Sequence, residues 1–102
     1  MVTHILLWNY RPEVPAAERA AIEATLLALP GRIPALAGLT FGPVFRWRVR
    51  EYSHACVMRF ADQAALDAYQ SDPAHRAFAA RFHPATAELV ALDYEEAPAP
   101  TG

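Results

Sequence analysis

The stretch from Tyr52 to Phe82, YSHACVMRFADQAALDAYQSDPAHRAFAARF, decides how this chain folds. Its first part, Tyr52 to Phe60, is mostly apolar or aromatic and predicts a β-strand. A short helix is expected to begin after Asp62, and a second helix after Asp72. In the second helix, side chains at three- and four-residue intervals define one inward face: His75, Phe78, Ala79 and Phe82.

The second helix has a well-marked start. Asp72 is a residue type favoured at N-caps, and Pro73 fits the first helical position, where its missing N–H is not needed. His75 is therefore predicted in the first turn, on the inward face. The positive end of the helix dipole and apolar surroundings both disfavour a protonated imidazole there. His75 thus becomes a candidate neutral base.

The composition predicts one globular domain. The chain has 102 residues, of which 54% are hydrophobic and 20% charged, and its formal charge is −2. That charge gives no general attraction for nucleic acid or for a membrane surface. Cys56 is the single cysteine, which excludes an intrachain disulfide and fits a reducing compartment. With no signal-peptide pattern and no apolar run near the ~20 residues of a membrane helix, a cytoplasmic protein without membrane or nucleic-acid partners is expected.

The remaining elements follow from the same patterns. We expect strands at Val2–Tyr10, Gly38–Phe45 and Leu89–Tyr94, and a helix at Ala16–Leu29 that Pro30-Gly31 ends. Pro43 places its strand at an edge of the sheet or at a bulge. Arg19 and Glu23 of the first helix are expected to face solvent as a pair.

The order of elements predicts the fold. It reads β-α-β-β-α-β, the ferredoxin-like arrangement of the α+β class, with a four-stranded antiparallel sheet and the helices on one face. This domain is expected to span residues 1–96, followed by a disordered Pro-rich tail at 97–102. Ile5, Leu7 and the apolar last strand make the opposite sheet face apolar as well. That face needs a partner, and a second copy in a homodimer is the simplest one.

Arginine alternates with aromatic and aliphatic residues between the second and third predicted strands. Arg46, Trp47, Arg48, Val49 and Arg50 form this segment. Interleaved arginine and aromatic residues occur in nucleic-acid contacts. Without a wider basic field, a solvated hairpin arm with a partly covered Trp47 is the favoured interpretation.

Several motifs resemble the stress-responsive dimeric α/β-barrel (Dabb) family. The matching segments are Thr3–Trp8, Tyr52–Ala55, Arg59–Asp62 and Tyr69–Phe78, with Ile33-Pro34 and Asp93-Tyr94 as further matches. Many relatives carry a His-Pro-Ala-His motif, in which Asp72 here replaces the first histidine. The resemblance implies a dimeric α/β barrel in which the last strand of each subunit reaches toward the other.

The resemblance also implies a set of site residues. A plant polyketide cyclase of this fold closes an aromatic ring by aldol chemistry without cofactor or metal. Likeness to it implies His75 as catalytic base and Tyr69 as acid, with His4 and His54 in the pocket. The implied pocket wall is Leu6, Trp8, Ile22, Leu26, Cys56, Phe78 and Leu89. Aromatic residues of the cyclase's tail pocket are replaced by Ile22, Glu23 and Leu26, and Trp8 is bulkier than its counterpart, which argues against a long linear polyketide.

Three functions from different classes stay open. The first is a homodimer that binds a small hydrophobic, phenolic or carbonyl ligand between sheet and helices and acts as a cofactor-free lyase, cyclase or isomerase. The second is a non-catalytic stress-response or scaffold dimer, in which His75 and Tyr69 only satisfy buried hydrogen bonds. The third is a cofactor-free monooxygenase-like barrel using Trp8, Asn9 and the histidines. No cofactor is expected, and no metal either, since the four histidines lack a ligand spacing and no carboxylate is expected beside them on the inward faces.

Overall fold

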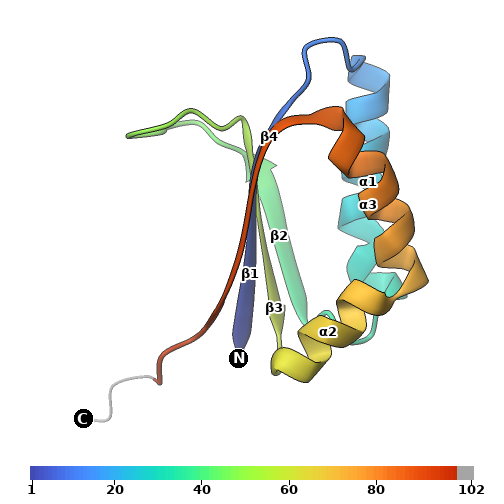
Figure 1. Cartoon of the computed structure of the whole chain (residues 1–102), viewed down its shortest axis with the longest axis vertical. Coiled ribbons are helices and arrows are strands. Elements are labelled where there is room, and N and C mark those ends of the chain that lie inside the picture. The colour runs from blue at the N-terminus through green and yellow to red at the C-terminus, as the bar shows by residue number, and fades with distance from the viewer. Residues whose placement is uncertain (99–102) are drawn as a thin grey trace.

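The computed structural model describes residues 1–98, and it consists of one sheet with all its helices on one side (Figure 1). In chain order the elements are β1 (Val2–Tyr10), α1 (Ala16–Arg32), β2 (Gly38–Pro43), β3 (His54–Phe60), α2 (Gln63–Ser71), α3 (Pro73–Ala85) and β4 (Thr86–Glu95). The predicted ferredoxin-like order is confirmed, with α2 and α3 together as its second helical segment. The predicted tail at 97–102 lies largely outside the described residues and stays a prediction. Among residues 1–98, no helix is long and apolar enough to cross a membrane.

The sheet has four strands in the order β2-β3-β1-β4, and all neighbours are antiparallel. The register pairs Leu6 of β1 with Cys56 of β3 on one side and with Ala91 of β4 on the other. Side chains of a strand alternate between faces, so these three residues share the face that the helices cover. β2 lies at the edge of the sheet, as Pro43 predicted.

The core lies between this face and the helices. Trp8, Tyr69, Phe60 and Phe82 are its largest fully buried side chains. α1 contributes Ile22, Leu26 and Leu29, which recur at helical spacing and are buried together. Burial of each such side chain favours folding by about 1.5–3 kcal/mol, so these contacts fix the helices on the sheet.

Two helices run further than their prolines predicted. α1 continues through Pro30 to Arg32, and α3 continues through Pro84 to Ala85. Both prolines stand in a last turn, where a missing N–H removes one hydrogen bond near the end of the ladder. Buried Ile33 and Ala85 hold these turns, since Ile33 N donates to the Leu29 carbonyl at 2.9 Å and the Ala85 carbonyl accepts from Arg11 N at 2.8 Å.

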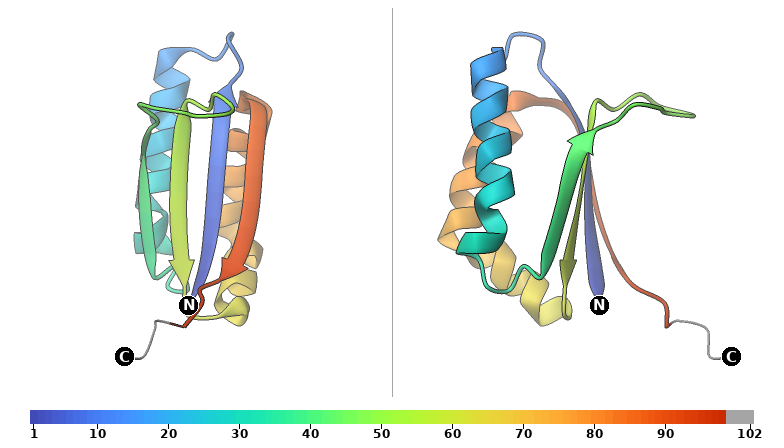
Figure 2. Two further views of the ribbon diagram at one scale, coloured as in Figure 1. Left: turned by 90° about the vertical axis from the view of Figure 1, so that its left-hand side faces the viewer. Right: turned by 180° about the vertical axis from the view of Figure 1, so that it is seen from behind.

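The segment between β2 and β3, residues 44–53, leaves the sheet on the side away from the helices (Figures 1 and 2). We call it the β2–β3 arm. The strand predicted to reach Phe45 ends at Pro43, and β3 begins at His54 rather than Tyr52. The arm is the solvated hairpin segment expected from the sequence, with Trp47 half-exposed.

The second sheet face carries no helix (Figure 2). The alternation of the strands places on it an apolar set: Ile5, Leu7, Val57, Val90, Leu92 and Tyr94. Leu92 and Tyr94 are exposed, while Ile5, Leu7, Val57 and Val90 are half-buried by their neighbours in the sheet. We call this surface the outer face.

Candidate functional site

The junction of α2 and α3 brings Tyr69 and His75 together. Asp72 ends α2 and also caps α3, because its Oδ1 accepts a hydrogen bond from Ala74 N at 2.8 Å. The chain therefore passes from α2 to α3 through this single residue, which brings the last turn of α2 beside the first turn of α3. The ring centroids of Tyr69 and His75 are 4.5 Å apart, with an interplanar angle of 49°.

A backbone contact determines the tautomer of His75. Its Nδ1 lies 3.1 Å from the Gln70 carbonyl oxygen. A carbonyl only accepts, so Nδ1 carries the proton and donates, which leaves the lone pair of Nε2 available in the neutral ring. Burial lowers the pKa of His75, while the Gln70 carbonyl opposes that shift. At neutral pH the ring is an uncharged base.

The pKa of Tyr69 is shifted in the opposite direction to that of His75. Its side chain is buried, and burial raises the pKa of its hydroxyl far above the ordinary value. The hydroxyl therefore keeps its proton at neutral pH and acts as a donor. Among residues 1–98 no protein atom takes a hydrogen bond from it, so a ligand oxygen has an unused donor to approach.

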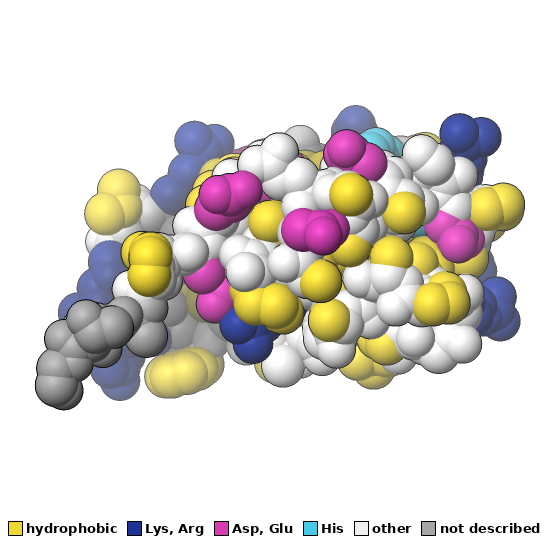
Figure 3. Space-filling view, turned by 90° about the horizontal axis from the view of Figure 1, so that it is seen from below, with side chains coloured by type: hydrophobic (Ala, Val, Ile, Leu, Met, Phe, Trp, Pro, Cys, Tyr) yellow, Lys and Arg dark blue, Asp and Glu magenta, His cyan; other side chains and the backbone are white. Residues whose placement is uncertain are grey.

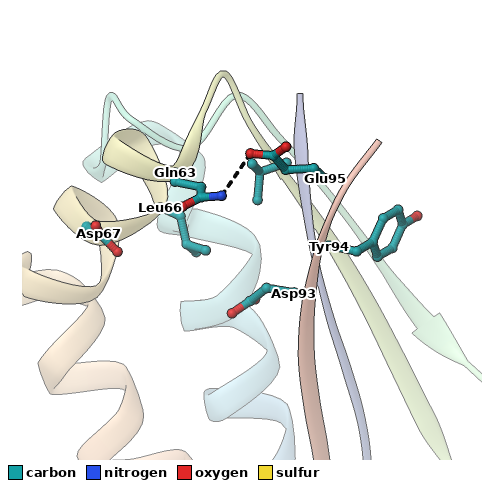
Figure 4. Close-up of a pocket in the computed structure, with 7 residues that line it drawn as sticks. Gln63, Leu66, Asp67, Asp93, Tyr94 and Glu95 are labelled. Carbon is teal, nitrogen blue, oxygen red and sulfur yellow. Dashed lines mark hydrogen bonds between the residues drawn. The ribbon is translucent and has the colours of Figure 1, made fainter. Parts of the chain in front are cut away.

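His4 contributes a third ring to this region. Its centroid is 6.4 Å from that of Tyr69, and its Nδ1 forms a hydrogen bond with Asp93 Oδ1. Asp93 lies directly opposite His4 in the β1–β4 pairing, so both side chains leave the sheet toward the helices. Figure 4 shows Asp93 and Glu95 on this side and Tyr94 on the other. The carboxylate accepts from Nδ1–H and thereby orients the imidazole, with Nε2 as its second nitrogen.

The three side chains meet at a cavity of about 200 Å³ between β1, β4 and the α2–α3 junction. It is lined by His4, Leu6, Tyr69, Gln70, His75, Phe78, Ala79, Phe82, His83, Leu89 and Ala91. Six residues named from the sequence as site residues are among them: His75, Tyr69, His4, Leu6, Phe78 and Leu89. The others among its lining residues were missed, although Ala79 and Phe82 lie on the helix face that the sequence identified.

Five of the pocket residues named from the sequence do not line this cavity: Trp8, Ile22, Leu26, His54 and Cys56. Trp8, Ile22, Leu26 and Cys56 are packed in the core, each less than 2% exposed. The Trp8 ring meets the edge of Phe82 at a centroid distance of 5.0 Å. The indole thus fills the space beyond Phe82, where the resemblance implied further pocket wall. Asn9 points to the outer face, where its amide bonds Glu51 and Ser53, away from the cavity.

His54 belongs to a separate polar cluster near the end of β1. Its ring stacks on Trp8 at 5.5 Å, and its Nε2 lies 3.9 Å from Glu23 Oε2. The same Glu23 oxygen accepts a hydrogen bond from the Tyr10 hydroxyl at 2.9 Å. Glu23 therefore faces the sheet instead of forming the solvent-facing pair predicted with Arg19, whose guanidinium lies over the Tyr10 ring. Burial lowers the pKa of His54, with Glu23 opposing.

The expectation that no carboxylate would lie beside the inward-facing histidines is wrong. Asp93 lies beside His4, and Glu23 lies beside His54. Across residues 1–98, however, no three or more His, Cys, Asp or Glu side chains gather in a way that suits a metal ion.

A larger hollow of about 310 Å³ lies at the α2 end of the molecule (Figure 4). Asp67, Asp93 and Glu95 line it, and Gln63 Nε2 donates to Glu95 at 2.8 Å. In the view from below, acidic side chains lie among hydrophobic ones, and arginine side chains lie mainly toward the edges of the view (Figure 3). This hollow contains no neutral base beside a donor, so the cavity at His75 is the better candidate site.

Cys56 gives a prediction about strand orientation. The side chain is 1% exposed on the helix-facing side of β3, and burial raises the pKa of its thiol to about 12. Because the thiolate is the reactive form, we expect native protein to react with a thiol reagent far more slowly than urea-unfolded protein. Equal rates in both states, measured by absorbance with Ellman's reagent, would show that β3 presents its other face to the helices.

Comparison with known proteins places this architecture. The family model for the stress responsive A/B barrel domain matches residues 2–96. A dimeric ferredoxin-like protein of unknown function from Thermobifida fusca is 29% identical, with TM-score 0.79 over 91% of this chain and 88% of its own. A Dabb family protein with a ferredoxin-like fold from Mesorhizobium loti is 20% identical, with TM-score 0.81 over 95% and 97%.

A further similar structure has a named activity. A hydroxynitrile lyase from Passiflora edulis is 23% identical, with TM-score 0.88 over 97% of this chain and 96% of its own. No curated protein matches the sequence. The family match covers nearly the whole described chain and agrees with the order of strands and helices. The chain belongs to the stress responsive A/B barrel (Dabb) domain family.

Proposed function

We propose that the protein is a homodimer in which each subunit binds a small carbonyl or phenolic compound beside His75 and transfers a proton without a cofactor. The observation that carries this proposal is the His75–Tyr69 pair on the cavity wall, with the His75 Nδ1 proton committed to the Gln70 carbonyl. The free Nε2 is then the base that removes a proton next to a carbonyl group. The Tyr69 hydroxyl donates to the oxygen on which negative charge develops.

The two pKa shifts support this division of roles. Burial lowers the pKa of His75, which favours the neutral base, and raises the pKa of Tyr69, which favours the protonated donor. Neighbouring groups whose pKa values are shifted in opposite directions are suited to opposite roles, one as base and one as acid. In water, both groups would be closer to the wrong protonation state for this chemistry.

The cavity limits the size of the ligand. About 200 Å³ exceeds the ~150 Å³ of a cavity that accommodates benzene, but it leaves no room for a long chain. Leu6, Phe78, Phe82 and Leu89 supply an apolar wall, and Trp8 packs behind Phe82. A single substituted ring, a short β-diketone or an aromatic cyanohydrin fits these dimensions. The last class is included because a protein of the same fold is a hydroxynitrile lyase.

The experiment is a matched binding and turnover panel. Purified protein is titrated with phenols, β-diketones and aromatic cyanohydrins, and ligand-dependent chemical shifts are followed together with product formation. Binding should shift His75 and Tyr69 signals and leave those of the His54 ring unchanged. A panel in which every ligand leaves the His75 and Tyr69 resonances in place would contradict the proposed site.

A non-catalytic assembly protein is the second candidate, and the outer face favours it. Its exposed apolar side chains indicate that association is part of the function whether or not chemistry occurs. Binding without any turnover across the panel would support this alternative.

The homodimer is itself a prediction. The outer face is apolar, and similar structures are described as dimeric. We therefore expect a dimer mass by sedimentation velocity at micromolar concentration, with Leu92→Lys shifting the equilibrium toward monomer because it places a charge on that face. A wild-type monomer throughout the micromolar range would contradict the dimer.

A further inference from the structure

The β2–β3 arm carries three of the seven large hydrophobic side chains that are exposed among the described residues. Phe45 is 90% exposed, Val49 is 99% exposed and Trp47 is 50% exposed. Isolated exposed apolar residues are ordinary, but three within five positions of one projecting segment form a contact surface. The arm extends to the side of the sheet that the helices leave open (Figures 1 and 2).

The base of the arm is anchored, so its direction is fixed. Val44 N donates to the Ser53 carbonyl at 2.8 Å and closes the base. Asn9 of β1 holds the returning segment, because its Oδ1 accepts from Ser53 N at 2.8 Å and its Nδ2 donates to the Glu51 carbonyl at 3.0 Å. Arg50 also pairs with Glu88 of β4 at 3.0 Å. The exposed apolar side chains are thus presented by a supported segment.

The arm is long enough to extend alongside a second sheet packed on the outer face. Five extended residues span up to about 17 Å, whereas two packed sheets lie ~10 Å apart. A second sheet placed on the outer face would therefore lie beside the arm rather than beyond it. The arm and the outer face border one another at Asn9 and Glu88, so one partner contacts both.

We propose that the β2–β3 arm clasps a second copy of this chain, with Phe45, Trp47 and Val49 packed against the partner and the two arms related by the twofold axis. The proposal rests on the homodimer of the proposed function and adds a specific contact to it. A twofold dimer buries both arms at once, so the same contact forms twice in each dimer.

The arginines of the arm favour a protein partner over nucleic acid. Arg50 is paired with Glu88, and its guanidinium also lies over the Tyr52 ring at 5.9 Å. The Arg46 guanidinium lies over the Phe45 ring at 5.7 Å. Glu51 adds a negative charge to the same segment. Phosphate binding needs an open cationic array, and these contacts engage two of the three arginines within the chain.

Trp47 makes the contact measurable, since Trp8 is fully buried and Trp47 is the other tryptophan. Acrylamide quenching of the full chain, compared with a Trp47→Phe variant, isolates the Trp47 signal. We expect Trp47 to be protected in the dimer and to become accessible on dilution. The double variant Phe45→Ser, Val49→Ser should raise the dimer dissociation constant at least about 100-fold, because each loss occurs twice in the interface.

Leu27→Ser is the matched control. Leu27 is a 55% exposed aliphatic residue on α1, in the layer away from the arm, so its replacement should leave the dimer unchanged. A stable dimer with fully accessible Trp47, or a double variant that dimerises like the wild type, would overturn the clasp and leave the sheet-face dimer standing. A monomer at all concentrations would overturn both. Protection of Trp47 only after addition of single-stranded DNA would assign the arm to nucleic acid instead.

Discussion

Replacement of His75 by alanine is expected to reduce turnover of any substrate by a factor of about 10²–10⁴, the contribution of a positioned general base. The variant loses the Nε2 lone pair at the cavity wall and keeps the cap at Asp72, so α3 still begins at the same residue. The lost hydrogen bond to the Gln70 carbonyl should cost folding only about 0.5–1.5 kcal/mol. Activity and stability therefore separate, which turnover assays and urea unfolding of the same sample measure together.

Two further variants test whether the loss of turnover is specific to the proposed site. Tyr69→Phe keeps the buried ring and removes the donor, so it should lower kcat while leaving the fold intact. His54→Gln removes a histidine outside the cavity and should change turnover little. If His75→Ala unfolds the protein, or His54→Gln is as damaging to turnover, the assignment of the base is wrong.

The pH dependence of turnover follows from the same residue. His75 accepts a proton only when neutral, and burial lowers its pKa. Activity should therefore persist as pH falls below ~6.5, the pKa of a free histidine, and disappear as pH falls through the lowered value. An acidic limb of kcat/KM above that reference would contradict a neutral base with a lowered pKa.

Phe78→Ala is expected to have the largest effect on stability, about 3–5 kcal/mol. The ring is 4% exposed and stacks on Phe82 at a centroid distance of 5.0 Å, so truncation enlarges the cavity and exposes the second ring. A domain of this size has roughly 5–15 kcal/mol of total stability, so much of the margin would disappear. Urea unfolding at fixed protein concentration gives the value.

The matched comparison for Phe78 is Leu27→Ala. Leu27 is 55% exposed on α1, and its loss should change the free energy of unfolding by less than about 0.5 kcal/mol. A Phe78→Ala variant as stable as Leu27→Ala would show that the α3 face is not packed as described.

The hydrophobic periodicity of the strands and the helix caps made most of the fold predictable from the sequence. Alternation in Val2–Tyr10 and in the strand ending at Phe60 placed His4, Leu6 and Cys56 on one face, because a strand has only two faces to choose from. Asp72 and Pro73 fixed the start of α3, since a cap acts through its own neighbours. Local rules failed at Pro30, where a buried neighbour holds the last turn of α1.

The cavity could not be delimited in the same way. His4 and Trp8 share one strand face, yet one lines the cavity and the other fills the core, because Phe82 stands between the cavity and the indole. Alternation gives the face of a side chain and not its depth among contacts from other elements. Asp93 was missed as the partner of His4 for a related reason. Its role depends on the β1–β4 register, which no local pattern specifies.

The most direct test of the proposed site is a ¹⁵N NMR titration of the His75 ring in the ligand-free protein. Nitrogen shifts report both the pKa and which nitrogen carries the proton. We predict a pKa below the ~6.5 of a free histidine, with the neutral ring protonated at Nδ1 and bare at Nε2, as the Gln70 contact requires. A pKa above that reference, or a neutral ring protonated at Nε2, would leave no base facing the cavity and would contradict the proposed function.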